Sequence, residues 1–199
     1  QQPEADRAAL GRLCSVLAKV RARRVVLIST IDVYPTPLGV DEDTFFEPGA
    51  AAYGRHRFLL EKFVQDHFDA LILRLPGLFG PGLKKNIIYD FLHDNQVAQI
   101  DSRGVFQFYD LANLWRDVMR ASDAGLRVLN VATEPVGVEE LVSYAFGKTF
   151  RHEPPDRTPA RYDMRSVHAS LFGGSRGYLY DRQAVLDAAK AFVRDAKKP

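Results

Sequence analysis

Apolar residues recur along the chain at two different spacings, and each spacing predicts one kind of element. Over 6–20 they return every three or four positions, which predicts an amphipathic helix. The run 24–29 is apolar and rich in β-branched residues, and such runs suit strands buried on both faces of a parallel sheet. Helical spacing returns over 52–68, and 70–75 is a second apolar run. The chain therefore opens with two helix–strand units.

The alternation continues toward the end of the chain. A third strand is expected over 127–132, and further helices are expected over 87–92, 112–122, 138–146 and 181–196. Strands that alternate with helices favour an α/β fold built around a parallel sheet.

Two stretches do not follow this alternation. Residues 83–110 and 147–180 lack a sustained period, and we interpret them as two insertions that form a second, smaller lobe. The segment 35–48 is rich in proline and acidic residues, which is typical of a loop. We therefore expect a sheet domain over 1–82 and 111–146. The small lobe, together with the C-terminal helix, is expected over 83–110 and 147–199.

Composition and charge exclude several classes of protein. The 199 residues are 46% hydrophobic and 26% charged, which is ordinary for a globular chain. The 27 basic and 25 acidic residues give no reason to expect nucleic acid or an anionic membrane as a partner. The single cysteine, Cys14, cannot form an internal disulfide, and a cytoplasmic location is expected. The five histidines lack metal-ligand spacing, so no metal site is expected.

Tyr53 and Arg57 carry the first chemical signal. They lie four positions apart in the helix expected over 52–68, so their side chains share one face. A cation close to a phenol favours the phenolate, and a tyrosine tuned in this way can exchange a proton with a substrate hydroxyl. Thr30 follows the first strand, at the edge where open α/β sheets bind ligands, and its hydroxyl could bond the same oxygen. The plainer interpretation is a core tyrosine beside a surface arginine.

Several short motifs occur in a fixed order along the chain. S-T-I-D-V-Y at 29–34 is followed by Y-G-R-H-R at 53–57 and by L-R-L-P-G-L-F-G-P at 73–81. Two further segments complete the series, at 103–111 and 130–132. In this order the motifs resemble the extended short-chain dehydrogenase/reductase family, the NAD-dependent epimerases and dehydratases that act on nucleotide sugars. The resemblance covers essentially the whole chain.

The resemblance implies a catalytic role for three residues. Tyr53 would be the general acid/base, and the Thr30 hydroxyl would orient the substrate. Arg57 stands where the family has a lysine that binds the nicotinamide ribose, and the two side chains are not interchangeable. The implied cofactor is NAD or NADP. Its nicotinamide end would also meet the turn formed by Pro76, Gly77 and Leu78.

The same resemblance suggests which residues contact the substrate. Asp32 stands where some dehydratases of the family place an acidic residue, although a turn residue after the strand is an equally good interpretation. Gly77 replaces the asparagine that usually touches the nucleotide sugar. Asn86 and Arg103 are therefore the candidates for the diphosphate, since a guanidinium can bind phosphate through two hydrogen bonds. The alternative for Arg103 is a solvated surface arginine.

The family begins with a strand, a glycine-rich turn and a helix that hold the cofactor pyrophosphate, and these 199 residues contain no such segment. The resemblance therefore implies the C-terminal part of a Rossmann-like parallel sheet, with helices on its faces and a small substrate-binding lobe. Two explanations compete: a fragment of a longer enzyme, or a short protein that lost cofactor binding. We expect the fragment, and an isolated fragment could be inactive.

The leading hypothesis is an NAD(P)-dependent epimerase, dehydratase or reductase that acts on a sugar, expected to be nucleotide-linked, in polysaccharide biosynthesis. The main rival is a non-catalytic sugar-nucleotide-binding or interaction protein on the same scaffold. An RNA-associated relative is disfavoured by the charge balance. In this family two helices, here 6–20 and 53–68, commonly build a homodimer interface, and we extend that expectation to this chain.

Overall fold

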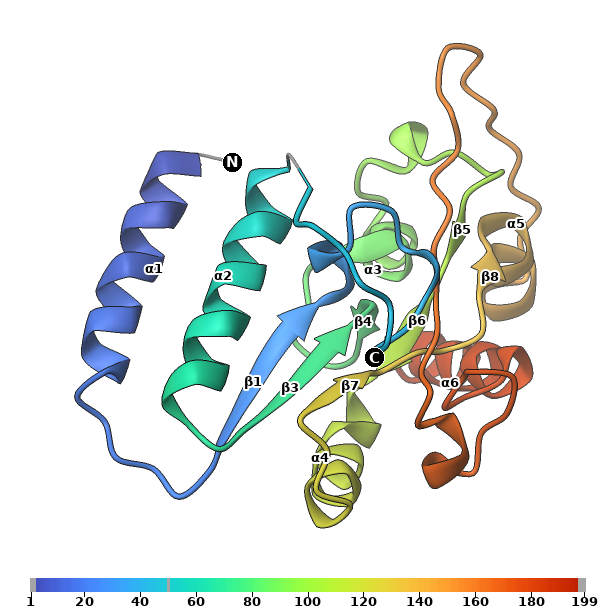
Figure 1. Cartoon of the computed structure of the whole chain (residues 1–199). Coiled ribbons are helices and arrows are strands. Elements are labelled where there is room, and N and C mark those ends of the chain that lie inside the picture. Colours follow the sequence, from blue (N-terminus) through green and yellow to red (C-terminus); the bar gives the residue numbers. More distant parts are fainter. Residues whose placement is uncertain (1–2, 50, 197–199) are drawn as a thin grey trace.

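The structure is a computed structural model that describes residues 3–49 and 51–196 (Figure 1). At its centre lie three parallel strands in the order β1 (Val25–Thr30), β3 (Ala70–Leu75) and β7 (Val128–Asn130). The register of the first pair runs from Val25 opposite Ala70 to Thr30 opposite Leu75. This arrangement confirms the expected α/β fold with a parallel sheet.

Helices cover both faces of the central strand. Alternate residues of β3 point to opposite faces, and all six are buried. On one face Ala70 and Ile72 pack against α2 (Ala52–His67), and α1 (Pro3–Leu17) lies beside α2 (Figure 1). On the other face Leu71 and Leu73 belong to the same apolar cluster as α4 (Leu114–Asp123).

The expectation that the first strand is buried on both faces is wrong. Val26 and Ile28 of β1 are 41% and 49% exposed. The physical reason is position: β1 is an edge strand of this sheet, and within the described residues no helix covers the face that carries these two side chains.

Three two-stranded pairs surround the sheet. Their strands are β2 (Leu38–Val40) with β9 (Asp163–Met164), β4 (Gly77–Phe79) with β6 (Phe108–Asp110), and β5 (Val105–Phe106) with β8 (Val136–Gly137). The sequence patterns missed all of them, because two or three residues are too few to show a period. Gly77–Phe79, expected to be a turn, is one of these short strands, and β2 lies in the expected loop 35–48.

A second apolar cluster gathers the remaining helices, in which Ile88, Leu141 and Val185 are buried. These helices are α3 (Asn86–His93), α5 (Val138–Leu141) with the π-helical turn Val142–Phe146, and α6 (Arg182–Ala196). Short 3₁₀ turns complete the chain at Ile31–Val33 (η1), Val97–Gln99 (η2), Leu111–Asn113 (η3) and Ala169–Phe172 (η5). None of the described helices is both long and apolar enough to cross a membrane.

The bounds of α1 differ most from the expectation. Helix α1 begins and ends three residues earlier than predicted, at Pro3 and Leu17. Proline is well tolerated in the first turn of a helix, where its missing N–H would have no partner. At the other end, Lys19 and Val20 make i→i−3 backbone bonds that close the helix as a turn.

Candidate functional site

Gly54 brings the start of α2 onto the turn that follows β1. A Cβ atom on Gly54 would lie 1.9 Å from the carbonyl oxygen of Asp32, so only glycine allows this approach. Tyr53, the preceding residue, is 37% exposed. The close packing therefore holds the tyrosine next to the carboxyl end of β1, beside the turn that carries Thr30 and Asp32.

Thr30 and Asp32 form one small hydrogen-bonded unit. The Thr30 hydroxyl donates to Asp32 Oδ2 at 3.2 Å and accepts from the Asp32 backbone N–H at 3.2 Å. This bond caps the 3₁₀ turn η1. Asp32 is thus a turn residue, as one of the two sequence interpretations held, and its carboxylate still faces the Thr30 hydroxyl.

Arg57 contacts both the tyrosine and the neighbouring helix. Its guanidinium carbon lies 5.2 Å from the centre of the Tyr53 ring, and Nη2 donates to Asp6 Oδ1 at 2.7 Å. The other oxygen of Asp6 lies 2.6 Å from His56 Nδ1. The hydrogen bond from His56, together with the charge of Arg57, lowers the pKa of Asp6. Arg57 is thereby anchored to α1, and its role in cofactor binding stays a prediction.

A cavity of about 250 Å³ opens at the carboxyl ends of β1 and β3, where open α/β sheets bind ligands. Five of the residues expected to serve the site line it together: Thr30, Asp32, Pro76, Gly77 and Asn86. The structure thus brings residues from three separate segments to one place.

Asn86 is engaged in holding the local backbone. Its amide nitrogen donates to the Leu78 carbonyl, and its amide oxygen accepts from the Ile88 N–H at 2.8 Å. Its φ of +74° is one that asparagine tolerates better than most residues. The side chain thereby ties the start of α3 to β4, and Leu78 itself does not line the cavity.

Arg103 lies elsewhere, against a separate cavity of about 730 Å³ that Glu139, Glu140 and Glu153 also line. Its guanidinium donates to both oxygens of Asp101, at 2.9 and 2.7 Å, and to the carbonyls of residues 154 and 157. The hydrogen bonds from Arg103 lower the pKa of Asp101 to about 2. The Nε and Nη2 donors of Arg103 are therefore occupied, and phosphate binding by this residue stays a prediction.

The sequence patterns missed the aromatic wall of the cavity, made by Phe106, Phe108 and Tyr162. The Phe106 and Tyr162 rings are stacked, with centres 5.6 Å apart and planes 25° from parallel. Burial and the nearby Asp32 charge raise the pKa of Tyr162. Tyr162 reaches the cavity because its backbone N–H bonds the Val105 carbonyl, a pairing across 57 residues that no local pattern signals.

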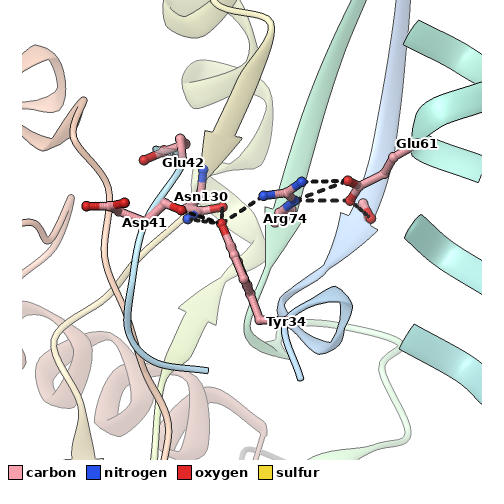
Figure 2. A network of polar contacts seen from close by, with 7 residues as sticks. Tyr34, Asp41, Glu42, Glu61, Arg74 and Asn130 are labelled. Carbon is pink, nitrogen blue, oxygen red and sulfur yellow. Dashed lines mark hydrogen bonds and ion pairs between the residues drawn. The ribbon is translucent and has the colours of Figure 1, made fainter. Parts of the chain in front are cut away.

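A buried network of polar side chains holds the end of β1 in place (Figure 2). Arg74 of β3 donates through Nη2 to Glu61 of α2 at 2.7 Å, and Glu61 also accepts from the Ser29 hydroxyl. Figure 2 shows Arg74 between Glu61 and Tyr34, and its Nη1 donates to the Tyr34 hydroxyl at 2.8 Å. The network ties the strand, the helix and the turn around Thr30 into one unit.

The network continues from Tyr34 toward β7 and the acidic loop. The Tyr34 hydroxyl donates to the Asp41 carbonyl at 2.7 Å and accepts from the Asn130 amide at 2.9 Å. Glu42 accepts from the Asn130 backbone N–H at 2.8 Å and from the Ser166 hydroxyl at 2.6 Å. Burial raises the pKa of Tyr34, so its hydroxyl stays a donor. Segments distant in sequence are thereby joined at the carboxyl end of the sheet.

Within 3–49 and 51–196 no three His, Cys, Asp or Glu side chains cluster as metal ligands. A parallel sheet with flanking helices, and a cavity at its carboxyl edge beside a tyrosine-bearing helix, define a Rossmann-like nucleotide-cofactor scaffold. Residues 4–142 match the NAD dependent epimerase/dehydratase family, and the chain belongs to that family.

Solved structures share this fold at low sequence identity. MoeE5, in complex with UDP-glucuronic acid and NAD, is 21% identical with a TM-score of 0.68, over 95% of this chain and 71% of that one. UDP-glucuronic acid 4-epimerase from Bacillus cereus is 14% identical with a TM-score of 0.70, over 96% and 67%. RMD from Pseudomonas aeruginosa, complexed with NADPH, is 17% identical with a TM-score of 0.68, over 94% and 70%. No curated protein matches the sequence at a significant level.

Proposed function

We propose that this chain supplies the proton-transfer apparatus of an NAD(P)-dependent enzyme that oxidises a sugar hydroxyl to a ketone. The observation that carries the proposal is the contact of Gly54, the residue after Tyr53, with the Asp32 backbone, because Thr30 and Asp32 of that turn line the cavity. Tyr53 would accept the hydroxyl proton, and Thr30 would hold the same oxygen by a hydrogen bond. The products of this step are a keto-sugar, a protonated tyrosine and a cofactor that would carry the hydride from the sugar carbon.

The residues present fit the nicotinamide end of the cofactor. Pro76 and Gly77 line the cavity at the end of β3. The Nε of Arg57 is buried and has no partner among the described residues. We assign Tyr53, Arg57 and the Pro76–Leu78 backbone to the nicotinamide ribose. When bound, the nicotinamide accepts the hydride that leaves the sugar carbon.

A nucleotide-linked sugar is the proposed substrate class. The support is family membership, together with solved relatives whose ligands are UDP-glucuronic acid or UDP-glucose. Asp32 is assigned to the sugar because it lines the cavity, and Asn86 and Arg103 are assigned to the diphosphate. Epimerisation, dehydration or reduction would follow the keto stage. We place the reaction in the cytoplasm, in the synthesis of polysaccharide precursors.

A homodimer through α1 and α2 is part of the proposal. Helix α1 has no buried residue, and Leu13 and Val16 on it are exposed. Leu59 of α2 is exposed as well. Leu10 and Cys14, on another face of α1, already pack toward the sheet. Two copies that pair these exposed faces would form a four-helix interface.

The proposal is tested on the natural full-length protein that carries this chain. NADH fluorescence measures cofactor binding, and sugar-dependent NADH formation measures turnover. We expect Tyr53→Phe to keep NADH affinity and to lose turnover by about 100-fold or more. Arg57→Ala should weaken NADH binding. Tyr89→Phe, a tyrosine of α3 outside this cavity, is the control and should match wild type. Unchanged turnover in Tyr53→Phe would contradict the proposed mechanism.

A second candidate is a non-catalytic protein that binds a sugar nucleotide on the same scaffold. Two observations favour it: Arg57, in place of the family's lysine, is held by Asp6, and Gly77 stands in place of asparagine. For this function we expect binding of UDP-glucose with no fluorescence change on addition of NADH. The enzyme function predicts that both ligands bind.

A further inference from the structure

The 250 Å³ cavity is lined by a negative charge without a positive one. Of its lining residues one, Asp32, is acidic, and no Lys, Arg or His lines it in the part of the chain that the structure describes. Asp32 forms no ion pair with any described residue, and its only side-chain bond comes from the Thr30 hydroxyl to Oδ2. The second carboxylate oxygen, Oδ1, is therefore available to accept hydrogen bonds from a ligand.

Tyr162 lines the same cavity, and its hydroxyl is available to a ligand. Its ring is stacked on Phe106, and its backbone is bonded to Val105, so the side chain is held in place. The hydroxyl makes no hydrogen bond within the described residues. Burial and the Asp32 charge raise the pKa of Tyr162, so the group stays neutral and can donate. A neutral donor thus stands beside a carboxylate acceptor.

We propose that Asp32 and Tyr162 make this cavity selective for an uncharged sugar ring, and that Tyr162 is a specificity-determining residue. The inference rests on the proposed function, since it takes the same cavity as the sugar site. Asp32 accepts hydrogen bonds from ring hydroxyls, and the Tyr162 hydroxyl donates to a ring oxygen. The stacked Phe106 and Tyr162 rings present an apolar surface to the C–H groups of the sugar.

A sugar that carries a carboxylate meets two costs in this cavity. Its charge must leave water for a site that offers no cation, and it lies within a Debye length of the Asp32 carboxylate. Opposed like charges in an interface discriminate strongly against a wrong ligand. A neutral hexose unit meets neither cost, because hydroxyls can both donate to Asp32 and accept from Tyr162.

UDP-glucose and UDP-glucuronic acid form a matched pair of probes, because they differ only in the carboxylate at carbon 6. Calorimetric titration of the natural full-length protein should give UDP-glucose an affinity about tenfold higher or more. Asp32→Asn should lower the ratio of the two affinities, because it removes the repulsion between the carboxylates and leaves only the cost of burying a charge in a site without a cation. Tyr162→Phe should weaken UDP-glucose about fivefold through loss of one hydrogen bond. Asp66→Asn, an exposed acidic residue of α2, is the control and should leave the ratio unchanged.

Equal or tighter binding of UDP-glucuronic acid by the wild-type protein would overturn the inference, and so would failure of both probes to bind. If Asp32→Asn disturbs the turn, Asp32→Ser keeps a short hydrogen-bonding side chain there and should give the same change in ratio. The two proposals fail separately. A ratio near one with Tyr53-dependent turnover removes only this inference, whereas an intact ratio without turnover removes only the proposed function.

Discussion

Three arginines are each held by a carboxylate, two of them near the site and the third, Arg103, at the separate cavity. Arg74 pairs with buried Glu61 behind β1, and Arg57 pairs with Asp6 across two helices. Arg103 pairs with Asp101 in the segment before β5. The Arg74 pair is almost fully removed from solvent, so either partner alone would be a buried charge without compensation. The three pairs therefore position backbone segments, and only Arg57 also contacts a proposed catalytic residue.

The stability that Asp101 contributes is predicted to depend on pH. Its hydrogen bonds with Arg103 lower its pKa in the folded protein from 3.8 to about 2. A carboxyl with a lowered folded pKa stabilises the protein above its unfolded pKa, and that contribution is lost as the pH falls through the folded value. Asp101→Asn should therefore lower the melting temperature at neutral pH.

The pH profile checks the sign of this effect. The gap in melting temperature between wild type and Asp101→Asn should be constant above pH 4 or so and should close between about pH 4 and pH 2. Asp66→Asn on α2 serves as the control, with no gap expected at any pH. A gap that widens toward acid would contradict the assignment.

At the scale of elements, the contact between α2 and the η1 turn decides whether the site exists. The Asp32 carbonyl oxygen would lie 1.9 Å from a Cβ on Gly54, and that oxygen is backbone, so it cannot rotate away. Alanine favours an isolated helix over glycine by about 1 kcal/mol, but the clash acts in the opposite direction and is larger. The helix or the turn must shift.

Gly54→Ala should therefore lower both stability and turnover, because the shift separates Tyr53 from Thr30. Gly11→Ala in α1 is a matched control: nothing lies within 4 Å of its Cβ position, so it should stabilise the protein by about 0.5–1 kcal/mol. Thermal unfolding and NADH formation measure the two effects. A Gly54→Ala protein as stable and active as wild type would show that the close approach is not required.

The sequence predicted those helices and strands that depend only on a local pattern of apolar residues. Ala70–Leu75 forms a strand at the predicted residues, because a run in which five of six residues are apolar can bury both faces only in the middle of a sheet. For the similar run in β1 the prediction of burial on both faces is wrong. A strand's position at the edge of a sheet depends on which other strands pair with it, and the run itself does not show this. Asp6 and Tyr162 could not be placed, because each meets its partners across about fifty residues or more.

At the scale of the whole molecule, exposed apolar side chains on α1 and α2 lead to a prediction about assembly. Val16 is 62% exposed, and its replacement should not disturb the core. We expect Val16→Glu to convert a dimer into a monomer in sedimentation velocity, because a charge would be buried at the interface. Trp115→Lys, at an even more exposed apolar site on α4, is the control and should leave the dimer intact. A monomeric wild-type protein would contradict the proposed interface.

The central claim is that Tyr53 takes the proton when the sugar is oxidised. The most direct measurement is a single-turnover experiment on the natural full-length protein, in which NADH fluorescence follows the reaction of enzyme-bound NAD with excess UDP-sugar. Wild type should form NADH in one phase, and Tyr53→Phe, with both ligands still bound, should form it about 100-fold more slowly or not at all. Equal rates for the two proteins would contradict the account.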